Sequence, residues 1–170
     1  MRWASIAIGL LCALVISAPY ARPLRLNDAE RVSERVLQLV NKARSHSRRC
    51  GTETLPAVNP VKLSAALAQT ARAHARDMAT HNFFEHTGSD GSTPTARLAR
   101  IGYRWLLTGE NIAYGPTSAE EVISGWLASP GHCENIMETR FTEMGIGYAF
   151  GSTRGKPMYW AQDFAVPRKP

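Results

Sequence analysis

The sequence lacks the motifs that mark several large enzyme classes. It has no His-Glu-x-x-His pattern of zinc proteases, no Gly-x-Ser-x-Gly elbow of serine hydrolases and no glycine-rich loop that cradles phosphate. It also has no internal repeat and no low-complexity segment. The uncharged run at residues 3–17 is short for a membrane span, which needs about 20 apolar residues. With 170 residues, the chain is long enough for one globular domain and hardly for two.

The first residues have the features of a secretory signal sequence. Arg2 supplies a positive charge, and the apolar run of residues 3–17 follows it. We expect cleavage after Ala18 or Ala21, so that residues 1–21 are removed and no transmembrane anchor remains. The product would be secreted or periplasmic. It would keep 19 basic and 14 acidic residues, a net charge of +5 spread along the chain, which indicates a solvated surface and not a nucleic-acid-binding protein.

Cysteine is scarce, and its positions suggest one bridge. Cys12 lies in the apolar run, which leaves Cys50 and Cys133 in the exported chain. An even pair of cysteines in an exported protein predicts a disulfide. From loop-closure entropy, such a bridge stabilises the fold by about 2–5 kcal/mol. Two free thiols are the alternative. Cys133 also follows His132, but neighbours in sequence rarely point at each other, so a disulfide partner explains it better than a nucleophile.

Apolar periodicity predicts helices first and antiparallel strands last. The expected helices cover residues 27–43, Asn59-Pro60 to about Thr80, a short segment from Thr93-Pro94, residues 118–129, and a second short segment from Ser129-Pro130. Strands are expected at 144–150 and 159–164 around a turn at 151–155, with a third near 103–108, while 44–59 is expected to be a loop. This pattern predicts a single α+β domain at residues 27–166, with helices packed on a small antiparallel sheet and with Trp126 and Trp160 largely buried.

Polar residues on three separated segments are candidates for a site. His86, Glu110, His132 and Glu134 could bring two imidazoles and a carboxylate together, a set that suits a divalent transition metal such as zinc. The same groups could perform general acid–base chemistry. Other interpretations stay open: a histidine after a Pro-Gly turn is typical of a surface or cap position. His74, inside an expected helix, fits a hydrogen-bonded structural role.

Five short motifs occur in this order: FFEHTGSDG at 83–91, GENIA at 109–113, WLASPGHCENI at 126–136, MGIG at 144–147 and YWAQDF at 159–164. Together they resemble one protein family, the CAP superfamily of cysteine-rich secretory, antigen 5 and pathogenesis-related proteins, whose domain is also called SCP. The resemblance is to the compact bacterial branch and covers about residues 30–165. It implies an α-β-α sandwich with a central cleft.

The resemblance also implies two histidines and two acidic residues in that cleft, and some family members bind zinc there. By motif, His86, Glu110 and His132 match three of the four, whereas Ser129 occupies the position of the second acidic residue. Glu134 lies nearby and could substitute, and Asn111 and Ser129 are expected to line the cleft. His86 and His132, with Glu110 as a further ligand, would then form a three-ligand site with an open water position.

Three functional hypotheses follow. The first is a secreted binding module whose cleft takes a divalent metal, a lipid or a peptide-like ligand from the envelope. The second is a metal-assisted hydrolase in which His86 and His132 hold the ion and Glu110 is the general base. The third is a structural envelope protein with a vestigial cleft. The absence of a recognisable nucleophile places the binding module first.

Overall fold

The protein is described by a computed structural model that covers residues 26–151 and 158–168. The expected signal sequence at 1–21 lies outside the described residues. So does the expected turn at 151–155, except for its first residue.

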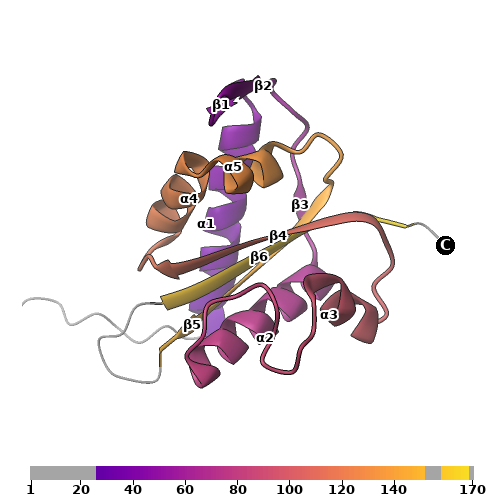
Figure 1. Ribbon diagram of the computed structural model, residues 1–170. Helices are drawn as coiled ribbons and strands as arrows, with labels where there is room; N and C mark the ends of the chain where they lie inside the picture. The colour runs from indigo at the N-terminus through magenta and orange to yellow at the C-terminus, as the bar shows by residue number, and fades with distance from the viewer. Residues whose placement is uncertain (1–25, 152–157, 169–170) are drawn as a thin grey trace, which may run out of the picture.

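Two layers of helices enclose one mixed sheet, as Figure 1 shows. The sheet has the strand order β3-β5-β6-β4; α1, α4 and α5 cover one face, and α2 and α3 cover the other. The α+β class and the three-layer arrangement are therefore confirmed. The elements are α1 (Leu26–Arg44), β1 (Arg48–Cys50), β2 (Glu53–Leu55), β3 (Lys62–Leu63), α2 (Ala65–His81), α3 (Pro94–Arg100), β4 (Trp105–Gly115), α4 (Ala119–Ala128), α5 (Pro130–Met137), β5 (Glu143–Phe150) and β6 (Met158–Pro167).

The segment before α2 differs from the expectation. The Asn-Pro pair at 59–60 does not begin a helix, because β3 pairs in parallel with β5 and Ser64 caps a helix that starts at Ala65. The backbone N–H groups of Lys62 and Ser64 donate to the carbonyls of Thr142 and Met144, so sheet hydrogen bonds outweigh the local capping signal. The expected loop at 44–59 likewise contains the β1–β2 hairpin.

The expected third strand is longer than the sequence indicated. β4 runs from Trp105 to Gly115, whereas the prediction ended it near residue 108. The GENIA motif therefore lies in the strand and not after it. Residues 109–113 pair with β6 in antiparallel register, which places Glu110 directly opposite Asp163. The register thereby brings two carboxyl groups together inside the fold.

Alternation along β5 separates two different packing surfaces. Met144 and Ile146 face the core that α1, α4 and α5 cover, where Trp126 and Trp160 are buried as predicted. Gly145 and Gly147 face α2, whose backbone lies directly against them. Small residues on this side of the strand thus let the helix approach the sheet closely.

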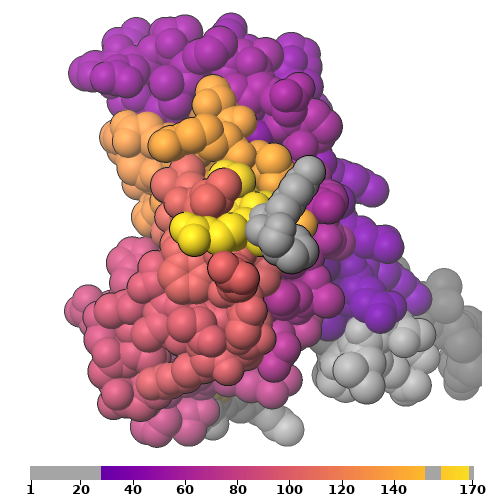
Figure 2. Space-filling view, turned by 90° about the vertical axis from the view of Figure 1, so that its right-hand side faces the viewer, coloured from indigo at the N-terminus to yellow at the C-terminus, as the bar shows by residue number. Residues whose placement is uncertain are grey.

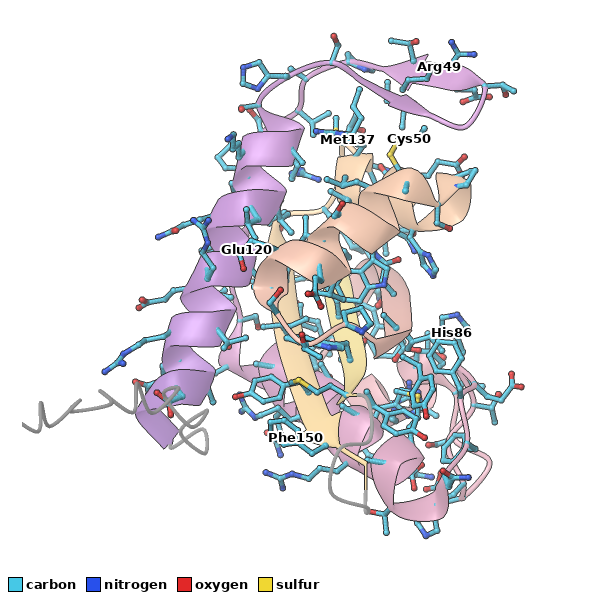
Figure 3. The ribbon with its side chains drawn as sticks, turned by 90° about the vertical axis from the view of Figure 1, so that its left-hand side faces the viewer. Arg49, Cys50, His86, Glu120, Met137 and Phe150 are labelled. Atoms are coloured by element: carbon cyan, nitrogen blue, oxygen red, sulfur yellow. A yellow bond between two sulfur atoms is a disulfide. The ribbon has the colours of Figure 1, made fainter. Side chains whose placement is uncertain are left out.

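Both ends of α5 are fixed to other parts of the fold. The predicted disulfide is confirmed: Cys50 of β1 and Cys133 of α5 are bonded, with 5.5 Å between their Cα atoms, and Figure 3 shows Cys50 above α5. At the other end, the buried guanidinium of Arg44 donates to the carbonyls of Ile136 and Glu138. No sequence pattern indicated this second attachment. Together the two anchors position the first turn of α5, which carries His132.

Two serine N-caps differ in a way that allows a controlled test. The Ser118 hydroxyl accepts a hydrogen bond from the Glu121 N–H, whereas Ser129 caps α5 without a side-chain bond. Ser118→Ala should lower the free energy of unfolding by about 1 kcal/mol, the usual value of a capping bond. Ser129→Ala should change it by less than half as much. Urea denaturation measures both, and equal losses would contradict the assignment.

Candidate functional site

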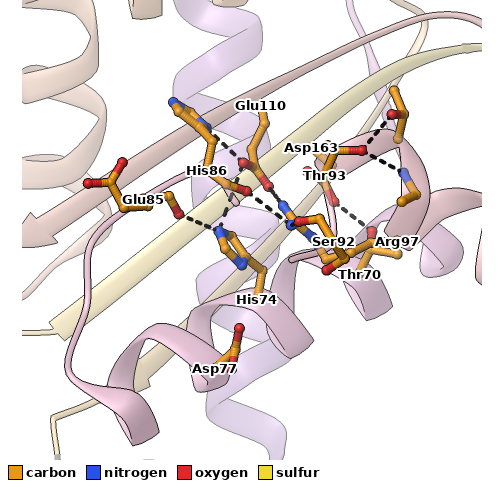
Figure 4. A network of polar contacts seen from close by, with 12 residues as sticks. Thr70, His74, Asp77, Glu85, His86, Ser92, Thr93, Arg97, Glu110 and Asp163 are labelled. Carbon is orange, nitrogen blue, oxygen red and sulfur yellow. Dashed lines mark hydrogen bonds and ion pairs between the residues drawn. The ribbon is translucent and has the colours of Figure 1, made fainter. Parts of the chain in front are cut away.

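The candidate site is built around the buried carboxylate of Glu110. This residue lies on β4, at the edge of the sheet, and only 2% of its side chain is exposed. One oxygen, Oε2, forms an ion pair with Nη2 of Arg97, and the other, Oε1, lies 2.8 Å from Nδ1 of His86 (Figure 4). Since a carboxylate only accepts, His86 donates through Nδ1–H. The charge of Glu110 is therefore balanced by Arg97 and shared with an imidazole.

Arg97 also fixes the segment that carries His86. Its Nη1 donates to the backbone carbonyls of His86 and Ser92, each at 3.0 Å. Arg97 itself lies on α3. The predicted start of this helix is confirmed, because the Thr93 side chain accepts a capping hydrogen bond from the Ala96 N–H. One guanidinium thus connects β4, α3 and the loop before it.

The two histidines near Glu110 differ in exposure and in pKa. His86 is 52% exposed in its side chain, and its hydrogen bond to Glu110 raises its pKa above the ordinary value. His74 is buried, and burial lowers its pKa, so its ring is neutral near pH 7. Its Nε2 lies 2.9 Å from the carbonyl of Glu85. His74 is therefore buried and hydrogen-bonded, as the structural interpretation expects, whereas His86 presents its ring to solvent.

Asp163 extends the buried network across the strands. It lies opposite Glu110 on β6, and the hydroxyl of Thr70 is 2.6 Å from its Oδ2. Burial, reinforced by the negative charge of Glu110, raises the pKa of Asp163 to about 8, so its carboxyl holds a proton at neutral pH. Neither Asp163 nor Arg97 was among the site residues predicted from the sequence. The polar pair Gln162-Asp163 inside an otherwise apolar strand was a signal that could have located the former.

His132 reaches the same edge of β4 from the opposite helix layer. It lies in the first turn of α5, as expected, and its carbonyl accepts a hydrogen bond of 3.3 Å from the Asn111 amide. Burial lowers the pKa of His132, and so does the nearby charge of His86. The two predicted histidines therefore lie close enough for their charges to interact. Figure 3 shows His86 between the two helix layers.

The three remaining predicted residues have other roles. Asn111 is fully buried and exchanges hydrogen bonds with Asn135, Gln162 and the His132 carbonyl, so it holds α5 on β4 and does not line a cleft. Glu134 is exposed on α5, two positions after His132, a spacing that places side chains on different sides of a helix. Ser129 is the N-cap of α5.

The geometry limits the groups that could hold a metal ion. Within the residues that the structure describes, no three His, Cys, Asp or Glu side chains are grouped as metal ligands. Both oxygens of Glu110 are engaged by Arg97 and His86, so this carboxylate fits poorly as a ligand or as a base for water. Among the described residues, neither Nε2 of His86 nor the ring of His132 forms a hydrogen bond. Glu110 orients the His86 ring, as a carboxylate behind an imidazole commonly does.

A nearby Ser, Asp and His set does not form a hydrolytic triad. Asp77 lies in the middle: its Oδ1 accepts from the Ser89 hydroxyl and is 2.8 Å from Nδ1 of His81. In a triad the histidine must lie between the other two, because it removes the serine proton. This set therefore ties the loop after α2 to the helix and supplies no activated nucleophile.

Comparisons with known proteins agree with this fold. The model of the "Cysteine-rich secretory protein family" matches residues 37–164 of the chain. The chain is 33% identical over 107 residues to the uncharacterized protein YkwD of Bacillus subtilis, an alignment that covers 63% of this chain and 40% of that protein. The chain thus spans less than half of this relative's length.

Solved structures with the same fold include two bacterial proteins. One is an extracellular protein containing an SCP domain from Bacillus anthracis, with a TM-score of 0.62 and 23% identity over 86% of this chain and 45% of that one. The other is an outer surface protein of Borrelia burgdorferi, with a TM-score of 0.63 and 21% identity over 84% of this chain and 95% of that one. In the described part of this chain, none of the helices has the length and apolar character needed to cross a membrane.

Proposed function

Because the chain belongs to the cysteine-rich secretory protein family, we propose that it is a secreted binding module in which His86 and His132 bind a divalent transition metal such as zinc. One observation carries the proposal: Nδ1 of His86 is held by a buried carboxylate that is itself anchored on Arg97. The apolar run at the N-terminus and the extracellular or outer-surface location in the names of the two structural relatives support export.

The residues around His86 prepare it as a ligand. The Glu110 carboxylate fixes the tautomer in which Nδ1 carries the proton, so the lone pair lies on Nε2, away from the buried network. A carboxylate behind an imidazole also raises its basicity and holds the ring in one orientation. Burial keeps the His132 ring neutral near pH 7, the form that can donate to a metal.

Two protein ligands would leave coordination positions open. A bound ion would supply Lewis-acid attraction for an oxygen atom of a second molecule. We therefore propose an envelope component with an oxygen donor, such as the carboxylate of a peptide or a lipid, as the ligand. Binding is favoured over hydrolysis because both oxygens of Glu110, the general base of the hydrolase hypothesis, are committed to Arg97 and His86.

Zinc binding tests the proposal directly. Calorimetric titration of the oxidised protein at pH 7.5 should show one site, and His86→Ala or His132→Ala should weaken binding at least roughly tenfold, because each removes one of two donors. His46→Ala is the matched control, since His46 is exposed just after α1 and its ring forms hydrogen bonds only with Ser45 and the Lys42 carbonyl among the described residues. Its affinity should be unchanged.

The pH dependence adds a second readout. Zinc competes with the proton on each imidazole, and Glu110 raises the pKa of His86. Affinity should therefore begin to fall, as the pH is lowered, above the ordinary histidine pKa of about 6.5. Absence of zinc binding, or equal effects of His46→Ala and His86→Ala, would refute the metal site and favour a structural envelope role.

A further inference from the structure

A β-bulge at the start of β4 turns a large apolar side chain outward. Trp105 pairs with Pro167 and Leu107 with Val166, so Leu106 is an extra residue without a partner on β6. Leu106 is 64% exposed, the highest value among the exposed large hydrophobic residues that the structure describes. Bulges of this kind commonly re-aim a side chain for a purpose other than core packing.

Two arginines flank the bulge. The N–H of Arg168 donates to the carbonyl of Arg104 at 2.9 Å, which fixes the two residues side by side at the sheet end. Both side chains line a surface pocket of about 310 Å³ together with Tyr103 and Trp105. Within residues 26–151 and 158–168, neither guanidinium has a hydrogen bond or an ion pair. We call Arg104, Trp105, Leu106 and Arg168 the bulge face.

One acidic group beside this pocket, the Glu143 carboxylate, is already paired. The Tyr103 hydroxyl donates to Oε2 of Glu143 at 2.8 Å, and the ammonium of Lys62 lies 3.4 Å from Oε1 of the same carboxylate. Among the described residues, no carboxylate lines the pocket itself. The bulge face therefore combines two positive charges with exposed apolar surface. Figure 2 looks onto this side of the molecule, where the end of β6 in yellow lies beside the salmon start of β4.

We propose that the bulge face docks the protein on the surface of an anionic phospholipid bilayer. The two guanidinium groups would bind lipid phosphates, for which the planar, multiply donating guanidinium is well suited. Leu106 would enter the boundary between headgroups and acyl chains, and Trp105 would lie at headgroup level, the depth at which tryptophan is enriched. Charge complementarity selects this occupant, because an apolar partner would offer nothing to either arginine.

The bulge face is separate from the metal site. Glu110 is four positions beyond Leu106 on β4, and no bond among the described residues joins the Arg104 or Arg168 side chain to the His86 network. Docking would hold the His86–His132 edge near the envelope without using either histidine. The proposal consequently stands or falls independently of zinc binding.

Vesicle co-sedimentation of the full chain tests the docking. We compare vesicles of phosphatidylglycerol and phosphatidylcholine with vesicles of phosphatidylcholine alone, at low and at physiological salt. Because every variant carries residues 1–25, their contribution to binding is the same throughout. Arg104→Gln/Arg168→Gln should weaken binding to anionic vesicles roughly 25-fold, about fivefold for each arginine near the membrane, and should reduce its salt dependence. Leu106→Ser should weaken it roughly tenfold.

One control variant and two control conditions decide the outcome. Arg72→Gln/Arg76→Gln removes the same charge from the exposed side of α2 and should have little effect. Equal losses from the two arginine pairs would show non-specific charge attraction and overturn the proposal. So would an absence of preference for anionic vesicles, or complete displacement by millimolar inorganic phosphate, which would indicate a site for free phosphate.

Discussion

Gly147→Ala is expected to destabilise the protein by about 3 kcal/mol or more, at the upper end of what overpacking usually costs. A Cβ atom at this position would lie 2.2 Å from the backbone nitrogen of Arg72 and 2.3 Å from its Cα. The obstacle is helix backbone, so no side-chain rotation can relieve it. Either α2 moves off the sheet or β5 distorts, and both changes open the core.

The matched control is Gly125→Ala on α4. A Cβ atom there meets nothing within 4 Å, and alanine has the higher helix propensity, so this variant should be more stable by up to about 1 kcal/mol. Urea denaturation followed by circular dichroism measures both changes. If Gly147→Ala does not fold, its soluble yield relative to Gly125→Ala replaces the midpoint. A loss below about 1 kcal/mol would refute the contact between α2 and β5.

The same close packing bears on the candidate site. Thr70 and His74 project from α2 toward Asp163 and Glu110, at distances that depend on how deeply the helix sits on the sheet. Gly145 and Gly147 permit that depth. The alternation of glycine with large residues in β5 predicts a strand. It also sets the distance between α2 and the sheet at which the buried polar network can form.

The sequence predicted well those elements whose signals are local. Apolar stripes located α1 and α4, the Thr93-Pro94 pair located the start of α3, and the period-two pattern located β5. The predicted start of α2 was wrong because the residues before this helix form backbone hydrogen bonds with β5. No local sequence pattern reveals this pairing. The length of β4 was underestimated for a related reason: its polar GENIA segment is stabilised by its partner strand.

For the candidate site, the sequence predicted which residues take part but not how they pair. Motif matching selected His86, Glu110 and His132; the structure brings His86 and Glu110 into contact and ties the His132 backbone to Asn111 of β4. It could not show that Arg97 neutralises Glu110, because that pairing depends on how α3 packs against β4. Strand register likewise decides that Asp163 lies opposite Glu110. These pairings change Glu110 from a free ligand or base into the residue that orients His86.

Glu110→Ala should lower the free energy of unfolding by about 3–5 kcal/mol, the usual cost of leaving one partner of a buried ion pair alone. The Arg97 guanidinium is 9% exposed and would lose its carboxylate, and its Nε already has no partner among the described residues. His86 would lose the bond that raises its pKa, so that pKa should fall toward the ordinary value. Urea denaturation measures the first effect, and NMR titration of the His86 ring measures the second.

A double-mutant cycle separates the ion pair from simple loss of packing. If the unpaired charge dominates, Arg97→Met added to Glu110→Ala should restore part of the stability, because it removes the buried cation. Asp163 can compensate in the single variant: freed from the repulsion of Glu110, its pKa should fall and its carboxylate can offset Arg97. Asp163→Asn in the Glu110→Ala background should therefore destabilise further. If Arg97→Met instead deepens the loss, Arg97 stabilises the protein through its bonds to the His86 and Ser92 carbonyls and not through Glu110.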